Sequence, residues 1–333
     1  MRIAVLHDEV GDAATLDVQD VLHQVRVVEA ALAALGHESV VLPCGMDLEV
    51  VRRALVSERP DLVFNLVEST GGYGAMIQVI PSLLEALSIP YTGASMEALG
   101  LTSNKITAKR RLLGAGLRTA PWVTETNGFA HGEVAGAHEV GGGRWILKPV
   151  WEHASVGLDA SAVVEGRSLA HLQEMLRERA LVVGHRIFAE RFIDGREVNV
   201  GLLGGPDGVS VLPPAEICFE DFPDDRPRIV DYRAKWVEDS FEYTHTPRSF
   251  AFSGDDESWL AEVRWMAEKA WVEFGLSGYA RVDFRIDDRR QPWILEINTN
   301  PCLSPDAGFA AALARAGIDF GSAVGRIVRC AIP

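Results

Sequence analysis

Short runs of hydrophobic residues alternate with a helical pattern in the first part of the chain. Three apolar runs predict buried strands, at residues 2–6, 39–43 and 61–66. Between the first two runs, residues 20–35 carry apolar side chains at the spacing of one helix face. This alternation of strand and helix predicts a small N-terminal domain with a parallel sheet over residues 1–95.

A different pattern begins at residue 96 and continues to residue 188. It predicts a helix at residues 103–113, a strand at residues 144–149 and an amphipathic helix at residues 165–180. These elements predict a small central domain over residues 96–188 that mixes helices and strands.

The last part of the chain, residues 189–333, predicts a third domain of helices and strands. At its start, residues 186–203 predict two strands joined at a glycine turn as a hairpin. A polar, proline-rich loop is expected at residues 213–228, and a helix at residues 258–275. The segments GYARVDFRID and QPWILEIN are predicted to pair, because only a short polar connection separates them.

The composition is that of an ordinary globular protein, with 333 residues of which 47% are hydrophobic and 24% charged. No apolar run approaches the ~20 residues needed to cross a bilayer, and the first one is too short for a signal peptide. The four scattered cysteines indicate a reducing compartment, so we expect the cytoplasm. The net charge of −15 argues against nucleic acids and anionic membranes as partners and leaves small molecules.

Four polar residues on the last two predicted strands form the sharpest candidate site. Arg281 and Asp283 alternate with apolar residues, so their side chains share one face of a strand. Pairing with the next strand would bring Asp283, Glu296 and Asn298 together. Two carboxylates and an amide suit Mg²⁺. The alternative is a solvated hairpin face with an Arg–Glu pair.

Two glutamates and an apolar centre suggest a place for a nucleobase. Glu190 and Glu197 flank Phe192–Ile193, and an adenine needs an apolar slot, backbone groups and a carboxylate. The alternative is two surface glutamates on a hairpin.

Lysines form a third group of candidates. Lys148 ends a buried strand, where a phosphate would justify its charge, although such lysines more often extend to solvent. Lys105 is the second candidate of this kind, and the small residues around Ser155, in residues 151–158, suit a flap over phosphates.

The order of these signals resembles that of the ATP-grasp superfamily, and more closely that of the D-alanine–D-alanine ligase family. The resemblance covers most of the chain, through SIPYTG, SNK, GAGLRTAPW, KPVWEHASVGL, AERFIDGREVNV, DYRAKW, GYARVDF and LEINTNPCLSP. It implies an ATP-grasp fold of α/β and α+β class, with an N-terminal parallel α/β domain and ATP between the other two. It also implies an ATP-dependent carboxylate–amine ligase that works through an acylphosphate, and a homodimer is expected from the family alone.

The resemblance assigns the residues that handle ATP. Lys105 and Lys148 would contact the phosphates, with the serine of the flap beside them. Glu190 would accept the adenine amino group, Ile193 would offer backbone to the adenine edge, and Glu197 would hold the ribose.

The same resemblance assigns the metal site and the catalytic residues. Asp283, Glu296 and Asn298 would bind two Mg²⁺ ions, for which Mn²⁺ can substitute, with Glu296 bridging the ions. Arg281 would stabilise the oxyanion of a tetrahedral intermediate. Lys235 would lie on the closing loop near the transferred phosphate.

The substrate half departs from the family pattern. The Gly–Ser–Ser run after the loop glutamate is His153–Ala154–Ser155, and the loop tyrosine is Trp236. The Ser–Leu pair that receives the second D-alanine's carboxylate is Ala307–Gly308, and the histidine after the FNL strand is Glu68. The N-terminal Glu-x-x-x-Ser segment that holds the first amine has no match.

Because these donors are missing, we expect amino-acid or peptide substrates other than two D-alanines. The loss of hydroxyl groups also favours a substrate bulkier than alanine. One alternative is a D-alanine–D-alanine ligase proper; another, of a different class, is a nucleotide-binding protein or acid kinase without ligase activity. The metal ligands and Arg281 argue against that last class, and Glu68, His153 and Asp306 are candidate general bases by position.

Overall fold

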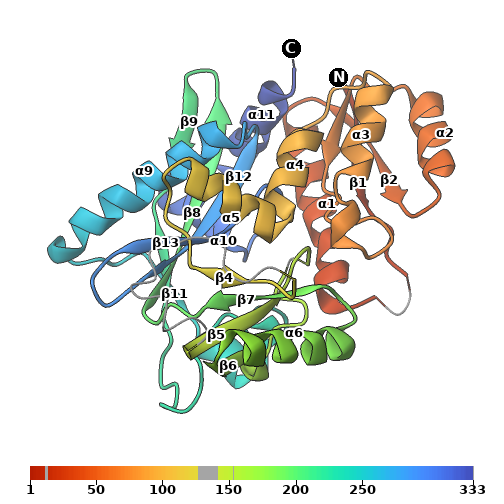
Figure 1. Ribbon diagram of the computed structural model, residues 1–333. Helices are drawn as coiled ribbons and strands as arrows, with labels where there is room; N and C mark the ends of the chain where they lie inside the picture. Colours follow the sequence, from red (N-terminus) through yellow and green to blue (C-terminus); the bar gives the residue numbers. More distant parts are fainter. Residues whose placement is uncertain (12–13, 127–141, 153, 333) are drawn as a thin grey trace.

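The computed structural model describes residues 1–11, 14–126, 142–152 and 154–332, so the candidate residue His153 lies outside the described ranges. The strands form three sheets, in the orders β2-β1-β3, β11-β10-β8-β12-β13 with β9 paired to β8, and β4-β7-β5-β6. In Figure 1 the first sheet lies at the upper right, and the third lies below the second. This arrangement confirms the predicted fold class, while the domain limits at residues 95 and 188 stay predictions.

The N-terminal sheet is parallel, as the alternation of strand and helix predicts. Strand β1 lies between β2 and β3 and pairs in parallel with both. Its apolar side chains are fully buried on both faces, against helix valines on one side and leucines on the other. The elements are β1 (Arg2–Asp8), α1 (Leu16–Ala34), β2 (Glu38–Cys44), α2 (Leu48–Glu58), β3 (Leu62–Asn65), η1 (Gly74–Met76) and α3 (Val79–Ala86).

The six-stranded sheet contains the predicted strand pair. Strands β12 and β13 are antiparallel, with Asp283 opposite Glu296 and Arg281 opposite Asn298. The loop expected at 213–228 includes a short strand, β10, that pairs with β8. The strands are β8 (Arg196–Gly205), β9 (Gly208–Val211), β10 (Ala215–Ile217), β11 (Arg248–Ser249), β12 (Tyr279–Ile286) and β13 (Pro292–Asn298).

Helices cover both faces of this sheet. One apolar cluster joins α4, α5 and α9 to β8 and β12, and another joins α10 and α11 to the sheet and to α1. The helix predicted at 103–113 is α5, which begins two residues later because Asn104 is its N-cap and its side chain accepts the Thr107 amide at 2.9 Å. The helices are α4 (Met96–Ser103), α5 (Lys105–Gly114), α9 (Glu257–Glu273), α10 (Gly308–Arg315) and α11 (Phe320–Cys330).

The four-stranded sheet corrects one predicted helix. Residues 163–167 form a strand, and α6 begins only after Ser168, whose hydroxyl accepts the His171 amide at 3.2 Å. The elements here are β4 (Trp122–Val123), β5 (Gly142–Pro149), η2 (Ala160–Ala162), β6 (Val163–Arg167), α6 (Leu169–Val183) and β7 (Ile187–Arg191). Short helices elsewhere are α7 (Tyr232–Trp236), α8 (Phe241–Thr244) and η3 (Gly254–Asp256).

The predicted hairpin over residues 186–203 is wrong. Strand β7 belongs to the four-stranded sheet and β8 to the six-stranded sheet, so the two strands do not pair. Residues 192–195 cross between the sheets. Gly195, at φ +133°, is required there, because a Cβ atom would lie 2.0 Å from the Ile286 carbonyl oxygen.

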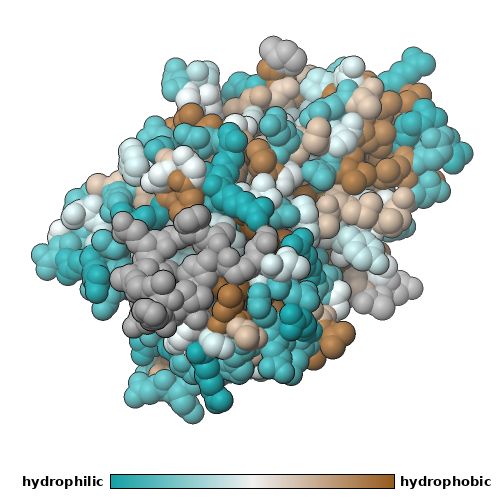
Figure 2. All heavy atoms as spheres, viewed as in Figure 1, coloured by the Kyte–Doolittle hydropathy of each residue, from teal (hydrophilic) through white to brown (hydrophobic). Residues whose placement is uncertain are grey.

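The surface agrees with the acidic composition. Figure 2 shows hydrophilic side chains over much of the visible face, with hydrophobic residues gathered mainly over the N-terminal part. In the described part of the chain, every helix is too short or too polar to traverse a bilayer.

Candidate active site

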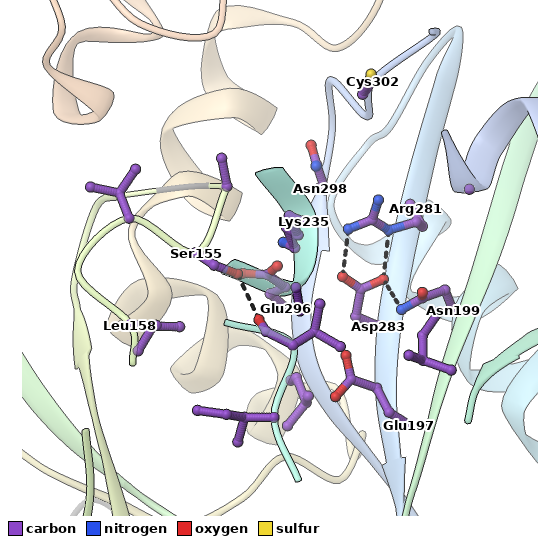
Figure 3. Close-up of a pocket in the computed structure, with 18 of the residues that line it drawn as sticks. Ser155, Leu158, Glu197, Asn199, Lys235, Arg281, Asp283, Glu296, Asn298 and Cys302 are labelled. Carbon is purple, nitrogen blue, oxygen red and sulfur yellow. Dashed lines mark hydrogen bonds and ion pairs between the residues drawn. The ribbon is translucent and has the colours of Figure 1, made fainter. Parts of the chain in front are cut away.

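A single cavity of about 460 Å³ collects the residues predicted to carry chemistry. It is lined from all three sheets, by Glu68 after β3, by Lys148 on β5 and by Asp283 on β12. Figure 3 shows part of this lining, with Lys235 of α7 near Glu296 and Asn298. Every predicted site residue within the described ranges lines it: Glu68, Lys105, Lys148, Ser155, Glu190, Ile193, Glu197, Lys235, Trp236, Arg281, Asp283, Glu296, Asn298, Asp306, Ala307 and Gly308.

A buried cluster of two lysines and one glutamate occupies the end nearest the four-stranded sheet. Lys148 Nζ lies 2.5 Å from Glu190 Oε1, and Lys109 Nζ lies 2.6 Å from Glu190 Oε2. Burial would raise the pKa of Glu190, but the two ammonium groups lower it overall. Because a carboxylate oxygen has more than one lone pair, Glu190 can still accept an adenine amino group.

Lys105 is the first residue of α5, directly after Asn104, which separates α4 from α5. Its ammonium group donates to the Glu152 carbonyl oxygen and lies 3.9 Å from Glu296 Oε2. Burial lowers its pKa, while Glu296 opposes the change. Lys105 therefore joins the predicted phosphate and metal residues from a fixed helix terminus.

Glu197, the predicted ribose residue, has its own buried partner. Arg285 Nη2 donates to Glu197 Oε2 at 2.8 Å, and Arg285 Nη1 donates to the Gly195 carbonyl oxygen at 3.1 Å. The arginine thus links the carboxylate to the segment that crosses between the sheets, which includes Ile193.

The predicted metal ligands lie on neighbouring strands. Asp283 accepts two bonds from Arg281, at 2.7 and 2.8 Å, and one from Asn199 at 2.8 Å (Figure 3). Within the described ranges, no three His, Cys, Asp or Glu side chains gather into a metal-binding group. Mg²⁺ commonly keeps waters and takes phosphate oxygens, so the oxygens of Asp283, Glu296 and Asn298 fit an ion that arrives with a nucleotide.

The closing loop, residues 218–240, is bonded to the flap of residues 151–158 and to helix α1. Trp236 Nε1 donates to the Ala154 carbonyl oxygen at 3.1 Å, and the Ser155 hydroxyl donates to the Val230 carbonyl oxygen at 2.8 Å. The Tyr232 hydroxyl donates to Asp17 of α1 at 2.8 Å. These contacts hold α7, and with it Lys235, over the cavity.

The opposite end of the cavity, beside the N-terminal sheet, is acidic. Asp20 of α1 accepts the Ser304 hydroxyl at 2.8 Å and the Cys302 thiol at 3.0 Å. Gln24 lies between Asp20 and Glu68, with its amide nitrogen 3.1 Å from the first and 3.3 Å from the second. Removal from water and the neighbouring Asp8 raise the pKa of Glu68 to about 8.

Similarity to known proteins covers nearly the whole chain. The model of the family described as D-ala D-ala ligase C-terminus matches residues 114–329. A D-alanine–D-alanine ligase of Methylococcus capsulatus is 31% identical over 98% of this chain and 94% of its own length. The chain belongs to the D-alanine–D-alanine ligase family. It is therefore an ATP-dependent ligase that forms carbon–nitrogen bonds, as the motifs predict.

Other members of the D-alanine–D-alanine ligase family agree with this assignment. The ligase of Gloeobacter violaceus is 30% identical over 98% of both chains. The fold matches that of the Bacillus anthracis ligase complexed with ATP, with a TM-score of 0.73 and 20% identity over 99% of this chain and 97% of the other. The Coxiella burnetii ligase matches with a TM-score of 0.69 and 18% identity, covering 99% and 95%.

Several residues that line the cavity or bond to its lining were not predicted from the sequence. Lys109 lies one helical turn after Lys105, and Arg285 continues the alternation of Arg281 and Asp283, so both had a signal in the sequence. Asp20 had none, because it belongs to no motif of the resemblance. Arg248 had none either, because the strand that carries it is too short to give a pattern.

The raised pKa of Glu68 predicts how stability depends on pH. Between the ordinary carboxyl pKa of about 4.3 and about 8, the folded protein keeps a proton that the unfolded chain has lost. The contribution of Glu68 to the free energy of unfolding therefore falls as pH rises, by at most about 1.4 kcal/mol per pH unit. Urea unfolding between pH 5 and pH 8 should show a flatter profile for Glu68→Gln than for wild type. The surface variant Glu174→Gln should keep the wild-type slope, and an unchanged slope in Glu68→Gln would contradict the prediction.

Proposed function

We propose that the protein joins two D-alanines into a dipeptide with hydrolysis of ATP to ADP and phosphate. The names of its relatives favour this substrate pair over the other substrates that the altered motifs suggested. The observation that carries the proposal is the charge pattern of the cavity. Asp20 and Glu68 line it beside the N-terminal sheet, and Arg281 and Arg248 line the same cavity from β12 and β11. A dipeptide has an ammonium group and a carboxylate at opposite ends, so it is complementary to this pattern.

The acidic end supports a place for the first ammonium group. The N-terminal segment expected from the family is missing, but α1 supplies Asp20 to the same cavity as Glu68, and the Gln24 amide donates to both carboxylates. An ammonium group beside Glu68 would favour its ionised form, so amino-acid binding would release a proton from it. These residues would bind the ammonium group of the first amino acid in place of the missing N-terminal segment.

The reaction has two steps, phosphoryl transfer and attack by the amine. A carboxylate oxygen of the first amino acid attacks the γ-phosphorus of ATP, which gives an acylphosphate and ADP. The amine of the second amino acid attacks the acyl carbon, and the bond to phosphate breaks as the tetrahedral intermediate collapses. Lys105 and Lys148 position the phosphates, and Arg281 stabilises the oxyanion. Two Mg²⁺ ions at Asp283, Glu296 and Asn298 would neutralise phosphate charge.

A second candidate is ligation of other amino acids or small peptides. It is supported by Trp236, Ala307 and Gly308, which replace three residues of the family's substrate half. A kinase that releases the acylphosphate is the candidate of another class.

Phosphate release from Mg-ATP across pairs of amino acids, with product masses, tests the proposal. D-alanine alone should give phosphate and a mass equal to two D-alanines less one water. Another pair as the best substrate would favour the second candidate. Phosphate release from an acid without any amine, and no condensed product, would favour a kinase.

The state of the cysteines bears on the location of the enzyme. The four cysteines are free, which supports the proposed cytoplasmic location. A homodimer stays a prediction from the family.

A further inference from the structure

Arg248 brings a positive charge into the cavity and has no ion-pair partner among the described residues. It lies on β11, at the edge of the six-stranded sheet, where it is opposite Ile217 of β10. It lines the same cavity as Arg281 and Asp306. Throughout the described ranges, its guanidinium group has no hydrogen bond to the chain and no carboxylate within 4.0 Å.

The guanidinium group lies over Gly308, the first residue of α10. A Cβ atom on Gly308 would be 3.4 Å from Arg248 Nη2 and 3.5 Å from Nε. A leucine at this position, as in the family's Ser–Leu pair, would need the space that the guanidinium group fills. The change to Ala307–Gly308 is thus matched by the arginine, which takes the place of a larger side chain.

The charges around Arg248 favour an anion from outside the chain. Arg281 is balanced by its two bonds to Asp283, whereas Asp306, the acidic neighbour of Arg248, is too distant for an ion pair. Burial and the charge of Arg281 lower the pKa of Arg248. A carboxylate between the guanidinium group and the start of α10 would relieve this repulsion and accept two parallel bonds.

We propose that Arg248 binds the carboxylate of the amino acid that supplies the attacking amine. This inference rests on the proposed function, and it makes Arg248 a specificity-determining residue that takes over from the missing Ser–Leu pair. It restricts the second substrate to amino acids with a free carboxylate. Amides and esters of the same amino acid, which cannot form the charged pair, are rejected.

A competition between two acceptors tests the inference directly. D-alanine and D-alaninamide are mixed with Mg-ATP, and the ratio of the two condensed products is read by mass. D-alaninamide has no carboxylate to be phosphorylated, so it can act only as the acceptor. Wild type should prefer D-alanine by about 100-fold, and Arg248→Ala should reduce the preference to a few-fold. Arg248→Lys keeps the charge but cannot form a bidentate pair, so its preference should lie between those of wild type and Arg248→Ala.

Two further variants separate this role from general damage. Gly308→Leu should displace the guanidinium group and lower the preference as Arg248→Ala does. Arg110→Ala, which removes an exposed arginine of α5, should keep the wild-type ratio. The inference is overturned if Arg248→Ala retains the wild-type ratio, or if its main effect is a higher KM for ATP.

The outcome also distinguishes the inference from the proposed function. If wild type gives no condensed product, the proposed function fails. Binding of D-alanyl-D-alanine and of its C-terminal amide, measured by calorimetry with Mg-ADP present, then decides the inference. Tighter binding of the free carboxylate by wild type, lost in Arg248→Ala, supports it, and equal binding of the two probes overturns it.

Discussion

Replacement of Arg281 by methionine is expected to lower kcat for dipeptide formation by about 10²- to 10³-fold, with little change in the KM for ATP. The guanidinium group is oriented by two bonds to Asp283, at 2.7 and 2.8 Å, on the strand that faces Glu296 and Asn298. Under the proposed function, this orientation places it in advance for the oxyanion that develops only in the transition state. Such an interaction lowers kcat when it is lost, and leaves ground-state binding in place.

A lysine variant separates the effect of the arginine's bonding geometry on kcat from the effect of its charge. Arg281→Lys keeps a positive charge but cannot form the bidentate bond, so its kcat should lie between those of wild type and the methionine variant. Arg289→Met, on the exposed turn between β12 and β13, is the matched control and should behave as wild type. Steady-state phosphate release with D-alanine gives both constants. A methionine variant within a few-fold of wild-type kcat would remove Arg281 from the chemistry.

The strand pair that carries Arg281 could be predicted because its signal is local. Polar residues recur at every second position on both strands, and the short connection leaves little freedom in how the strands pair. The structure has Asp283 opposite Glu296, as this pattern requires. The parallel N-terminal sheet was predicted for a similar reason, since short apolar runs separated by a helix favour that connection.

The crossing between β7 and β8 could not be predicted from local pattern. Two apolar strands around Asp194–Gly195 look the same whether the chain turns back or passes to another sheet. The difference depends on Ile286, whose carbonyl oxygen lies against Gly195 although it is far away in sequence. Only the long-range packing of β12 against β8 decides between the two arrangements.

The substrate end of the cavity was the least predictable part. The altered residues Ala307 and Gly308 suggested an open pocket for a bulkier substrate, but the guanidinium group of Arg248 fills the space above Gly308. Asp20 likewise brings a negative charge into the cavity although the family's N-terminal segment is missing. Arg248 contacts Gly308, and Asp20 contacts Ser304, from elements that are distant in sequence, so no single motif shows either contact.

Glu190→Gln is expected to destabilise the protein by about 3–5 kcal/mol. Its carboxylate is paired with Lys109 at 2.6 Å and Lys148 at 2.5 Å, and its side chain is only 1% exposed. A neutral amide would leave two ammonium groups facing each other away from water. Urea unfolding at pH 7 gives the difference in free energy, with the slope of the transition as a check on two-state behaviour.

Lys148→Met is the matched control for Glu190→Gln, because it removes one of the two ammonium groups and leaves the Lys109–Glu190 pair intact. It should destabilise the protein less than Glu190→Gln does, because Glu190 keeps Lys109 as its partner, while it weakens ATP binding. The double variant should then be more stable than Glu190→Gln alone, because the repulsion between Lys109 and Lys148 is gone. Lys109 would still donate to Thr119 Oγ1 at 2.7 Å and to the Ala120 carbonyl oxygen at 2.9 Å. Strictly additive effects would show that the two lysines do not share Glu190, since independent sites add and coupled sites do not.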